Sequence, residues 1–395
     1  MISNITKHKQ IVILSVCIVI LLIIFTLLPK VLSSHYTFSN AASNLASVGT
    51  TTIKKVDDFV PTHIKTPEPV KAIYMTSWVA SDSKLRNGLV KIIDDTELNS
   101  LVIDIKDYSG RLVFSVNDEK LKSFGSEEVR VRDMREFIES LHKKNIYVIG
   151  RVAVFQDAYF VKHRPDLAVR NLSGTEVWKD RKGISWIDAG SREYWDYIIQ
   201  IAKESYAVGF DEINFDYIRF PSDGDMKNIS YPWSSTSPKT IALKNFFEYL
   251  QSHLKDSGLK TSADLFGMTT TAEDDMGIGQ LLENALPYFD YIMPMVYPSH
   301  YSAGSILNLK NPADHPYEVV YKAMGTALKR REALASTTRQ KLAEYRPWLQ
   351  DFDLGADYGP KEVRAQIKAT NDLGITGWAL WSASNKYTSS ALIKN

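Results

Sequence analysis

The sequence predicts an α/β fold in which eight parallel strands close into a (β/α)8 barrel over residues 70–395. Two observations support this prediction. Short apolar runs typical of buried strands alternate with longer segments of helical periodicity, which is the order of repeated βα units. The count is eight strands with seven helices between them, as such a barrel requires. A doubly wound open sheet is the alternative, but it usually has fewer strands and a glycine-rich first turn, which this sequence lacks.

The predicted elements follow one another in strict alternation. The strands are expected at 71–78, 100–106, 146–152, 212–218, 260–267, 290–297, 346–352 and 376–382. The helices are expected at 84–97, 130–144, 190–207, 238–256, 278–286, 316–343 and 360–373. The connections that follow strands are long, notably 107–128, 156–189 and 219–237. In such barrels these connections form the C-terminal face, where substrates bind, so we expect the functional site there.

The N-terminal region predicts a transmembrane signal anchor at residues 11–29. Its core, IVILSVCIVILLIIFTLL, holds eighteen uncharged residues. A helix of that length spans about 27 Å, close to the hydrocarbon thickness of a bilayer. Lys7 and Lys9 precede it, which favours a short cytoplasmic tail at residues 1–10 and export of the rest. A cleaved signal peptide is the alternative, although its apolar core is usually shorter and ends at a small-residue cleavage site.

Residues 30–69 are predicted to be a flexible linker between the anchor and the barrel. The segment is rich in Ser, Thr, Asn and Ala and then carries Pro61, Pro67 and Pro69. Such a composition does not build a hydrophobic core. The expected localisation is therefore the cell membrane, with a single span, the lipid bilayer as a partner and the barrel domain outside the cytoplasm.

Composition excludes several classes of function. The chain has 47 basic and 46 acidic residues, for a net charge of +1, and they are interspersed, so no nucleic-acid footprint is expected. Its one cysteine, Cys17, lies in the apolar run, which excludes an intrachain disulfide and a cysteine-based metal site. The sequence has no HExxH, GxxxxGK[ST] or GxGxxG motif. We therefore expect neither a metal nor a cofactor.

The fourth predicted strand, in GFDEINFDYIRFP (209–221), carries an unusually polar face. Strand alternation places Glu212, Asn214 and Asp216 on one side, opposite Ile213, Phe215 and Tyr217. Burying ionised groups without partners costs several kcal/mol, so this face is expected to be paired or used in function. In a barrel it points to the axis, with Asp216 nearest the C-terminal end of the strand.

Other strands end in polar residues in the same way. Asp104 and Lys106 are predicted to share one face of the second strand, Arg151 and Asp264 belong to the third and fifth, and Asp188 comes from a loop. A salt bridge at the barrel rim explains any one of them alone. The convergence of several carboxylates and cations favours an active site. The predicted substrate-binding residues are Asp104, Lys106, Arg151, Asp188, Glu212, Asn214, Arg219, Tyr297, His300 and Trp381.

Aromatic residues near the strand ends give a second indication. Tyr297 and Trp381 are among several tyrosines and tryptophans placed there, and core packing accounts for at least half of the group. The others are suited to stack on the apolar faces of sugar rings. Carboxylates beside such aromatics suit glycosidic cleavage, in which one carboxylic acid protonates the leaving oxygen while another carboxylate attacks the anomeric carbon or activates water.

Six segments carry a resemblance to a known family: VIDIKDYSG, GFDEINFDYIRFP, SADLFG, MPMVYPSHY, RPWLQDF and GWALWSASN. Together they resemble the glycoside hydrolase family with the DUF4015 domain, over roughly residues 70–387. The resemblance implies a TIM barrel distantly similar to the α-amylase clan. It also implies a strand-four aspartate as the catalytic nucleophile, which is Asp216 in this sequence.

The sequence departs from the amylase-like pattern at two positions. Asp264 stands at the end of strand five where that pattern has a glutamate acid/base, and Asn214 stands where it has an arginine. We predict Asp216 as nucleophile or base and Asp264 as general acid, with Glu212 and Asp104 as alternatives to Asp264. The predicted function is hydrolysis of glycosidic bonds in a cell-surface or extracellular polysaccharide.

Two other functions stay open from the sequence. A non-catalytic glycan-binding or cell-wall-associated barrel would have every inward carboxylate locked to an arginine or lysine. An amidase or deacetylase would need a metal site or a nucleophile beside a histidine. His300 is the one histidine at a predicted strand end, and no second ligand follows from spacing.

Overall fold

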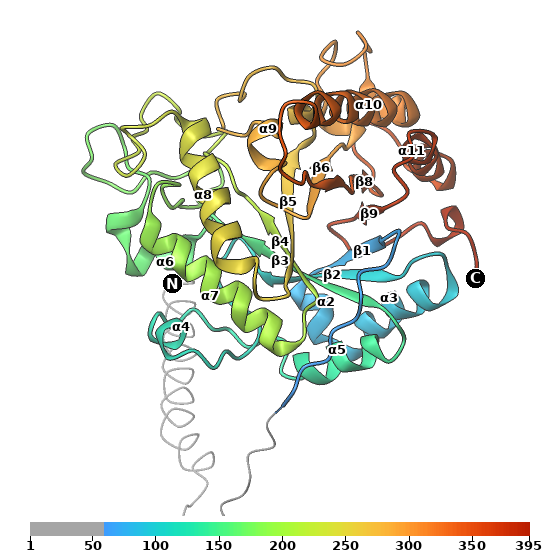
Figure 1. The fold of residues 1–395 in the computed structure, drawn as a ribbon, viewed down its shortest axis with the longest axis horizontal. Helices are drawn as coiled ribbons and strands as arrows, with labels where there is room; N and C mark the ends of the chain where they lie inside the picture. The colour runs from blue at the N-terminus through green and yellow to red at the C-terminus, as the bar shows by residue number, and fades with distance from the viewer. Residues whose placement is uncertain (1–58) are drawn as a thin grey trace, which may run out of the picture. The chain divides into compact units, whose positions relative to one another are not determined.

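The computed structural model describes residues 59–395 and confirms the (β/α)8 barrel (Figure 1). The predicted tail and anchor, and the predicted linker up to residue 58, lie outside the described residues. The strands are β1 (Lys71–Met75), β2 (Ser100–Lys106), β3 (Tyr147–Ala153), β4 (Glu212–Asp216), β5 (Lys260–Phe266), β6 (Tyr291–Met295), β7 (Glu344–Tyr345), β8 (Trp348–Gln350) and β9 (Trp378–Trp381).

All strand pairs are parallel, and the pairing of β5 with β6 closes the sheet. β7 and β8 both pair with β6, and β8 also pairs with β9, so together they form the seventh of eight barrel strands. Pro347 lies between them. Because proline has no backbone N–H to donate, it interrupts the ladder at that point.

Helices follow the strands and cover the outside of the barrel (Figure 1). The longer ones are α3 (Ser83–Asp95), α5 (Met134–His142), α7 (Arg192–Val208), α8 (Lys239–Leu254), α10 (Pro316–Ala335) and α11 (Pro360–Asp372). The shorter ones are α2 (Ser77–Ser81), α4 (Glu119–Ser123), α6 (Ala158–His163) and α9 (Leu282–Ala285).

Three predicted helices are shorter than expected. The helix expected at 130–144 is α5, which spans only Met134–His142. The helix expected at 278–286 is reduced to α9, because Gly277 and Gly279 have positive φ angles of 70° and 82°, which a right-handed helix does not accommodate. The helix expected to end at residue 343 ends at Ala335.

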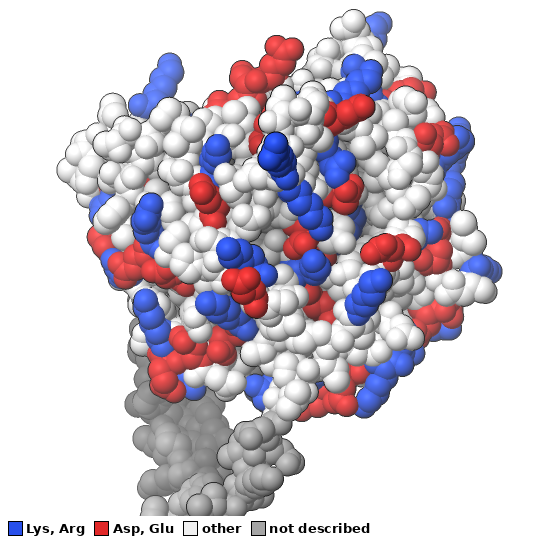
Figure 2. All heavy atoms as spheres, in the orientation of Figure 1, with Lys and Arg blue, Asp and Glu red and all other residues white. Residues whose placement is uncertain are grey.

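Side chains from alternate strand positions divide the core into two layers. Ile73, Ile103 and Ile213 belong to the large cluster in which the strands pack against the helices. A second, smaller cluster, which includes Val102 and Met293, lies inside the barrel. Figure 2 shows basic and acidic residues interspersed over one face of the molecule, as expected from the near-zero net charge.

The chain enters the barrel through residues 59–69, which form neither helix nor strand but contact the barrel. The Ile64 backbone N–H donates to Asp211 Oδ1 at 2.9 Å, and the Thr66 hydroxyl donates to the Tyr147 hydroxyl at 3.1 Å. This part of the predicted linker is therefore anchored at the end of the barrel where β4 begins. Within residues 59–395, no helix combines the length and the apolar character needed to cross a bilayer.

Candidate active site

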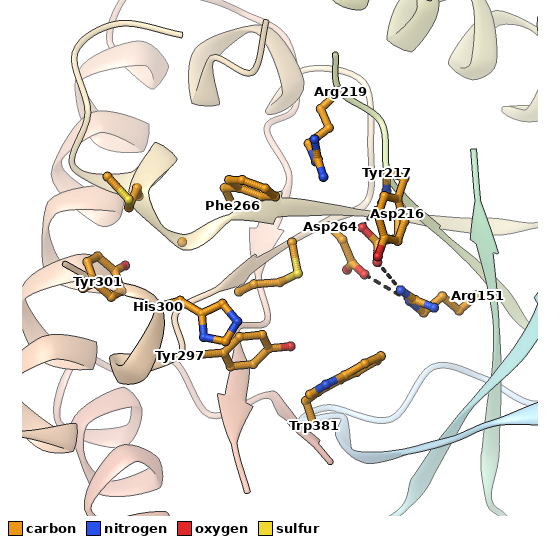
Figure 3. Close-up of a pocket in the computed structure, with 13 residues that line it drawn as sticks. Arg151, Asp216, Tyr217, Arg219, Asp264, Phe266, Tyr297, His300, Tyr301 and Trp381 are labelled. Atoms are coloured by element: carbon orange, nitrogen blue, oxygen red, sulfur yellow. Dashed lines mark hydrogen bonds and ion pairs between the residues drawn. The ribbon is translucent and has the colours of Figure 1, made fainter. Parts of the chain in front are cut away.

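A pocket of about 370 Å³ opens at the C-terminal ends of the strands. Six of its lining residues lie within the last three positions of their strands, so the barrel itself gathers them (Figure 3). The lining consists of Arg151, Asp216, Tyr217, Arg219, Asp264, Phe266, Gly267, Met268, Met295, Tyr297, His300, Tyr301 and Trp381.

Asp216 ends β4 and is held in place on both carboxylate oxygens. Its Oδ2 forms an ion pair with Arg151, and its Oδ1 accepts the Tyr217 backbone N–H at 2.5 Å. Tyr217 has a φ of +53°, which is uncommon for a residue with a side chain. The strand therefore ends sharply at Asp216, and the tyrosine ring turns into the pocket (Figure 3).

Asp264 lies on β5 and is more deeply buried than Asp216. Its Oδ1 accepts from Asn214 Nδ2 at 2.8 Å and from Trp348 Nε1 at 2.7 Å, and its Oδ2 is 3.8 Å from Arg151 Nε. Burial, followed by the nearby charge of Asp216, raises the pKa of Asp264 well above its usual range. This carboxyl group is therefore suited to hold a proton, as a general acid must.

Arg151 lies between the carboxylates and keeps its charge. Its Nη1 donates to Asp104 Oδ1 at 2.7 Å, and Asp216 binds the other terminal nitrogen. Burial opposes the charged form, but Asp216 and Asp104 outweigh it and raise the pKa of Arg151. The Tyr74 hydroxyl donates to the second oxygen of Asp104, which fixes that carboxylate behind the pocket wall.

Aromatic side chains form the opposite wall of the pocket. Trp381 stacks on Tyr74 with ring centroids 4.0 Å apart and packs edge-on against Trp348. Tyr297 packs edge-on against His300, and burial lowers the pKa of the imidazole, which favours its neutral form. The pocket thus combines two carboxyl groups with flat apolar surfaces, as a sugar-binding site does.

Residues 72–387 match a family described as “Putative glycosyl hydrolase domain”, DUF4015. The chain belongs to the DUF4015 family. The match spans the whole barrel, from β1 to the segment that follows β9. The resemblance noted in the sequence is thereby confirmed. No curated protein matches the chain.

Several solved structures are similar to this chain. A hypothetical protein from Ruminiclostridium thermocellum ATCC 27405 is 31% identical, over 48% of this chain and 96% of that one, with a TM-score of 0.44. The PgaB (BpsB) glycoside hydrolase domain from Bordetella bronchiseptica is 12% identical, over 80% and 94%, with a TM-score of 0.53. The α-galactosidase TtGalA from Thermus thermophilus is 12% identical, over 82% and 60%, with a TM-score of 0.49.

The DUF4015 barrel brings seven of the predicted site residues to the pocket: Arg151, Asp216, Arg219, Asp264, Tyr297, His300 and Trp381. Asn214 and Asp104 lie one layer behind, where they bind Asp264 and Arg151. Within the described residues, no group of three His, Cys, Asp or Glu side chains is placed to hold a metal ion.

Three predicted residues lie away from the pocket. Lys106 pairs with Asp157 at 2.8 Å, because an irregularity in the pairing of β2 with β3 between Asp104 and Lys106 takes the lysine off the inward face. Glu212, at the start of β4, pairs with Arg346 at 2.8 Å at the far end of the barrel.

Asp188 is the third of these residues. Its carboxylate accepts the backbone N–H groups of Gly190 at 3.0 Å and Trp233 at 2.8 Å, and the Ser234 hydroxyl. Asp188 therefore ties the loop after β3 to the loop after β4 and supports the pocket from a distance.

Some lining residues were not among the predicted site residues. Phe266 and Met295 are the last residues of β5 and β6, so their position at a strand end is a signal that sequence reasoning could have used. Strand alternation predicted Tyr217 on the side of Ile213 and Phe215, opposite Asp216. Its positive φ interrupts the alternation of side chains along the strand, and the local sequence pattern does not predict this φ angle.

Proposed function

We propose that this DUF4015 protein is a glycoside hydrolase that cleaves a cell-surface or extracellular polysaccharide. Asp216 is the nucleophile or base, and Asp264 is the general acid. The observation that carries this proposal is the difference between the two carboxyl groups at one pocket. Asp216 is held against Arg151, whereas burial and the charge of Asp216 raise the pKa of Asp264. A carboxyl group that tends to keep its proton, beside a second carboxylate at the same pocket, is the arrangement that an acid and base pair needs.

The reaction follows from these two environments. Protonated Asp264 gives its proton to the glycosidic oxygen, and the bond from that oxygen to the anomeric carbon breaks. Asp216 either forms a bond to the anomeric carbon, which water later hydrolyses, or takes a proton from a water that attacks this carbon. Trp381 and Tyr297 offer faces for the sugar rings on either side of the cleaved bond.

The cellular setting is also part of the proposal. The apolar run at residues 11–29 would anchor the protein in the membrane, and the basic residues before it favour a barrel outside the cytoplasm. In that location the pocket meets polymers of the cell surface. Protease accessibility of the barrel in intact cells would test this orientation.

A polysaccharide digestion screen tests the activity. Purified full-length protein is incubated with a panel of cell-surface and extracellular polysaccharides, and new reducing ends are measured. We expect release of oligosaccharides from at least one polymer by the native protein and none by Asp216→Asn. Equal cleavage by both would refute the assignment of Asp216.

Glycan binding without cleavage is a second candidate, favoured by a specific observation. Arg151 binds both Asp104 and Asp216, and Arg346 binds Glu212, so three of the inward carboxylates are paired. Asp264 is held less tightly by a cation, since its Oδ2 lies 3.8 Å from Arg151 Nε. Tight binding of a glycan with no cleavage by the native protein would select this candidate.

A further inference from the structure

Arg219 differs from the other buried cations of the barrel. Four lysine and arginine side chains are buried in the part of the chain that the structure describes: Lys106, Arg151, Arg219 and Arg346. Three of them have a carboxylate at 2.7 or 2.8 Å, contributed respectively by Asp157, Asp104 and Glu212. Arg219 is only 8% exposed, yet no carboxylate of residues 59–395 lies within ion-pair distance of it.

The protein uses only one nitrogen of the Arg219 guanidinium. Nη1 donates to the Phe220 carbonyl at 3.0 Å and to the Ser222 hydroxyl at 3.1 Å. Among the described residues, neither Nε nor Nη2 has a hydrogen-bond partner. Figure 3 shows the guanidinium pointing into the pocket, so the donors left over face the space that a substrate would occupy.

Three aromatic rings hold this guanidinium in place. Its central carbon lies 4.6 Å from the Phe266 ring centroid, 4.8 Å from that of Trp186 and 5.5 Å from that of Tyr217. Aromatic faces orient a guanidinium without neutralising it. Burial lowers the pKa of Arg219, but an arginine still stays charged near neutral pH. The pocket therefore holds a preoriented cation that lacks a counter-ion.

We propose that the pocket binds a sugar that carries an anionic group, a carboxylate or a sulfate, and that this group accepts hydrogen bonds from Arg219. Two oxygens of a carboxylate or a sulfate can accept side by side from the fork of N–H donors that a guanidinium presents. Arg151 is not available for this role because Asp104 and Asp216 already share its charge. This inference rests on the proposed sugar-binding function and adds the chemical class of the substrate.

Anion binding is tested directly on the full-length protein in detergent, independently of any cleavage. The Nε–H signal of Arg219 is followed by NMR during titration with glucuronate, with glucose 6-sulfate and with neutral methyl glucoside. We expect saturable shifts with one or both anionic sugars and none with the neutral one, and the two anionic arms distinguish carboxylate from sulfate. No shift with either anion, or equal shifts with all three sugars, would overturn the inference.

Substrate choice gives a second test. Acidic polysaccharides are compared with their carboxyl-reduced or desulfated forms for binding to Asp216→Asn, which is expected to bind without cleaving. Arg219→Gln in that background should weaken binding of the acidic form about tenfold or more and that of the neutral form less than about twofold.

Arg192→Gln is the matched control for Arg219→Gln. Arg192 also lies over aromatic rings, 5.5 Å from that of Trp195, but it is exposed on α7, and its replacement should leave both affinities unchanged. If Arg219→Gln loses the same amount of affinity for the acidic and the neutral polysaccharide, the anion site is contradicted. The proposed hydrolase function is not affected by that result. Anion-dependent shifts without cleavage of any polymer would support the anion site and reject the hydrolase.

Discussion

Both ends of β4 carry a carboxylate that is paired with a buried arginine, but the two pairs have different surroundings. Glu212, its first residue, is fully buried and bound by Arg346 at 2.8 Å, with the Tyr147 hydroxyl at 3.2 Å. Asp216, its last residue, lies at the pocket with the neighbouring Asp264, whose pKa is raised. The inward face of one strand thus carries, at its first residue, an ion pair shut off from the pocket, which we call the closed end. At its last residue it carries an ion pair that opens onto the pocket beside Asp264.

The largest expected effect separates these two ends by activity. Asp216→Asn should lower the rate of polysaccharide cleavage about 10³-fold or more, because it removes the nucleophile or base. The free energy of unfolding should change little, since Arg151 keeps Asp104 as a partner. Initial rates and urea unfolding of the same samples measure both quantities. A large loss of stability would assign Asp216 a structural role instead.

The next effect concerns stability at the closed end. Glu212→Gln should lower the free energy of unfolding by about 3 to 5 kcal/mol, because Arg346 stays buried without a counter-ion. The activity of the molecules that remain folded should not change. In the double variant Glu212→Gln with Arg346→Met, much of the stability should return. Loss of activity without loss of stability would contradict this division of roles.

Opposite pH dependences provide the third comparison. The pKa of Asp264 is higher in the folded protein than in the unfolded chain. Between these two pKa values the folded protein binds more protons than the unfolded chain. The contribution of Asp264 to the free energy of unfolding therefore falls as pH rises through this window. Asp264→Asn should remove this fall. Cleavage should also decline as pH rises through the pKa of Asp264, because the general acid loses its proton.

Asp211, at the closed end, should behave in the other sense. Burial raises its pKa, but the hydrogen bond from His142, the His63 ring 3.6 Å away and the Val148 backbone N–H outweigh burial and lower it. The unfolded chain then binds more protons, so this contribution is lost as pH falls through the folded pKa. Asp211→Asn should flatten only the acidic side of the curve of unfolding free energy against pH. If Asp264→Asn and Asp211→Asn changed the pH dependence of the unfolding free energy in the same way, the two ends of the barrel would not differ as we expect.

The smallest expected effect concerns Arg219. Arg219→Met should change the free energy of unfolding by no more than about 1 kcal/mol, because no buried carboxylate loses its partner. Arg346→Met, which leaves Glu212 unpaired, should cost about 3 to 5 kcal/mol. Thermal unfolding of the two variants compares them. Equal losses would show that Arg219 serves the fold.

Much of the barrel followed from local patterns. All eight strands were predicted within a few residues, because apolar runs and turn residues are recorded in short stretches of sequence. The inward direction of Asn214 and Asp216 also followed, since side-chain alternation is a property of one strand. The split of the seventh strand at Pro347 could have been read from proline chemistry.

The predictions failed where a second element of the fold changes the environment of a residue. Lys106 was expected beside Asp104, but the irregular pairing with β3 sends it to Asp157. Asp188 was predicted as a site residue because it is an aspartate in a loop near the strand ends. Its carboxylate instead accepts backbone N–H groups from Gly190 and from Trp233, which belongs to a loop distant in sequence.

The sequence by itself determined the barrel, its family and the two carboxyl groups proposed for catalysis, because strand periodicity and motif order are local properties. Only the tertiary structure decided which charges are neutralised. Arginines from other strands pair with Glu212 and Asp216, whereas Arg219 meets three aromatic rings and no carboxylate. The electrostatic energy of a buried group depends on distances between strands far apart in the chain, and these distances exist only once the barrel has closed.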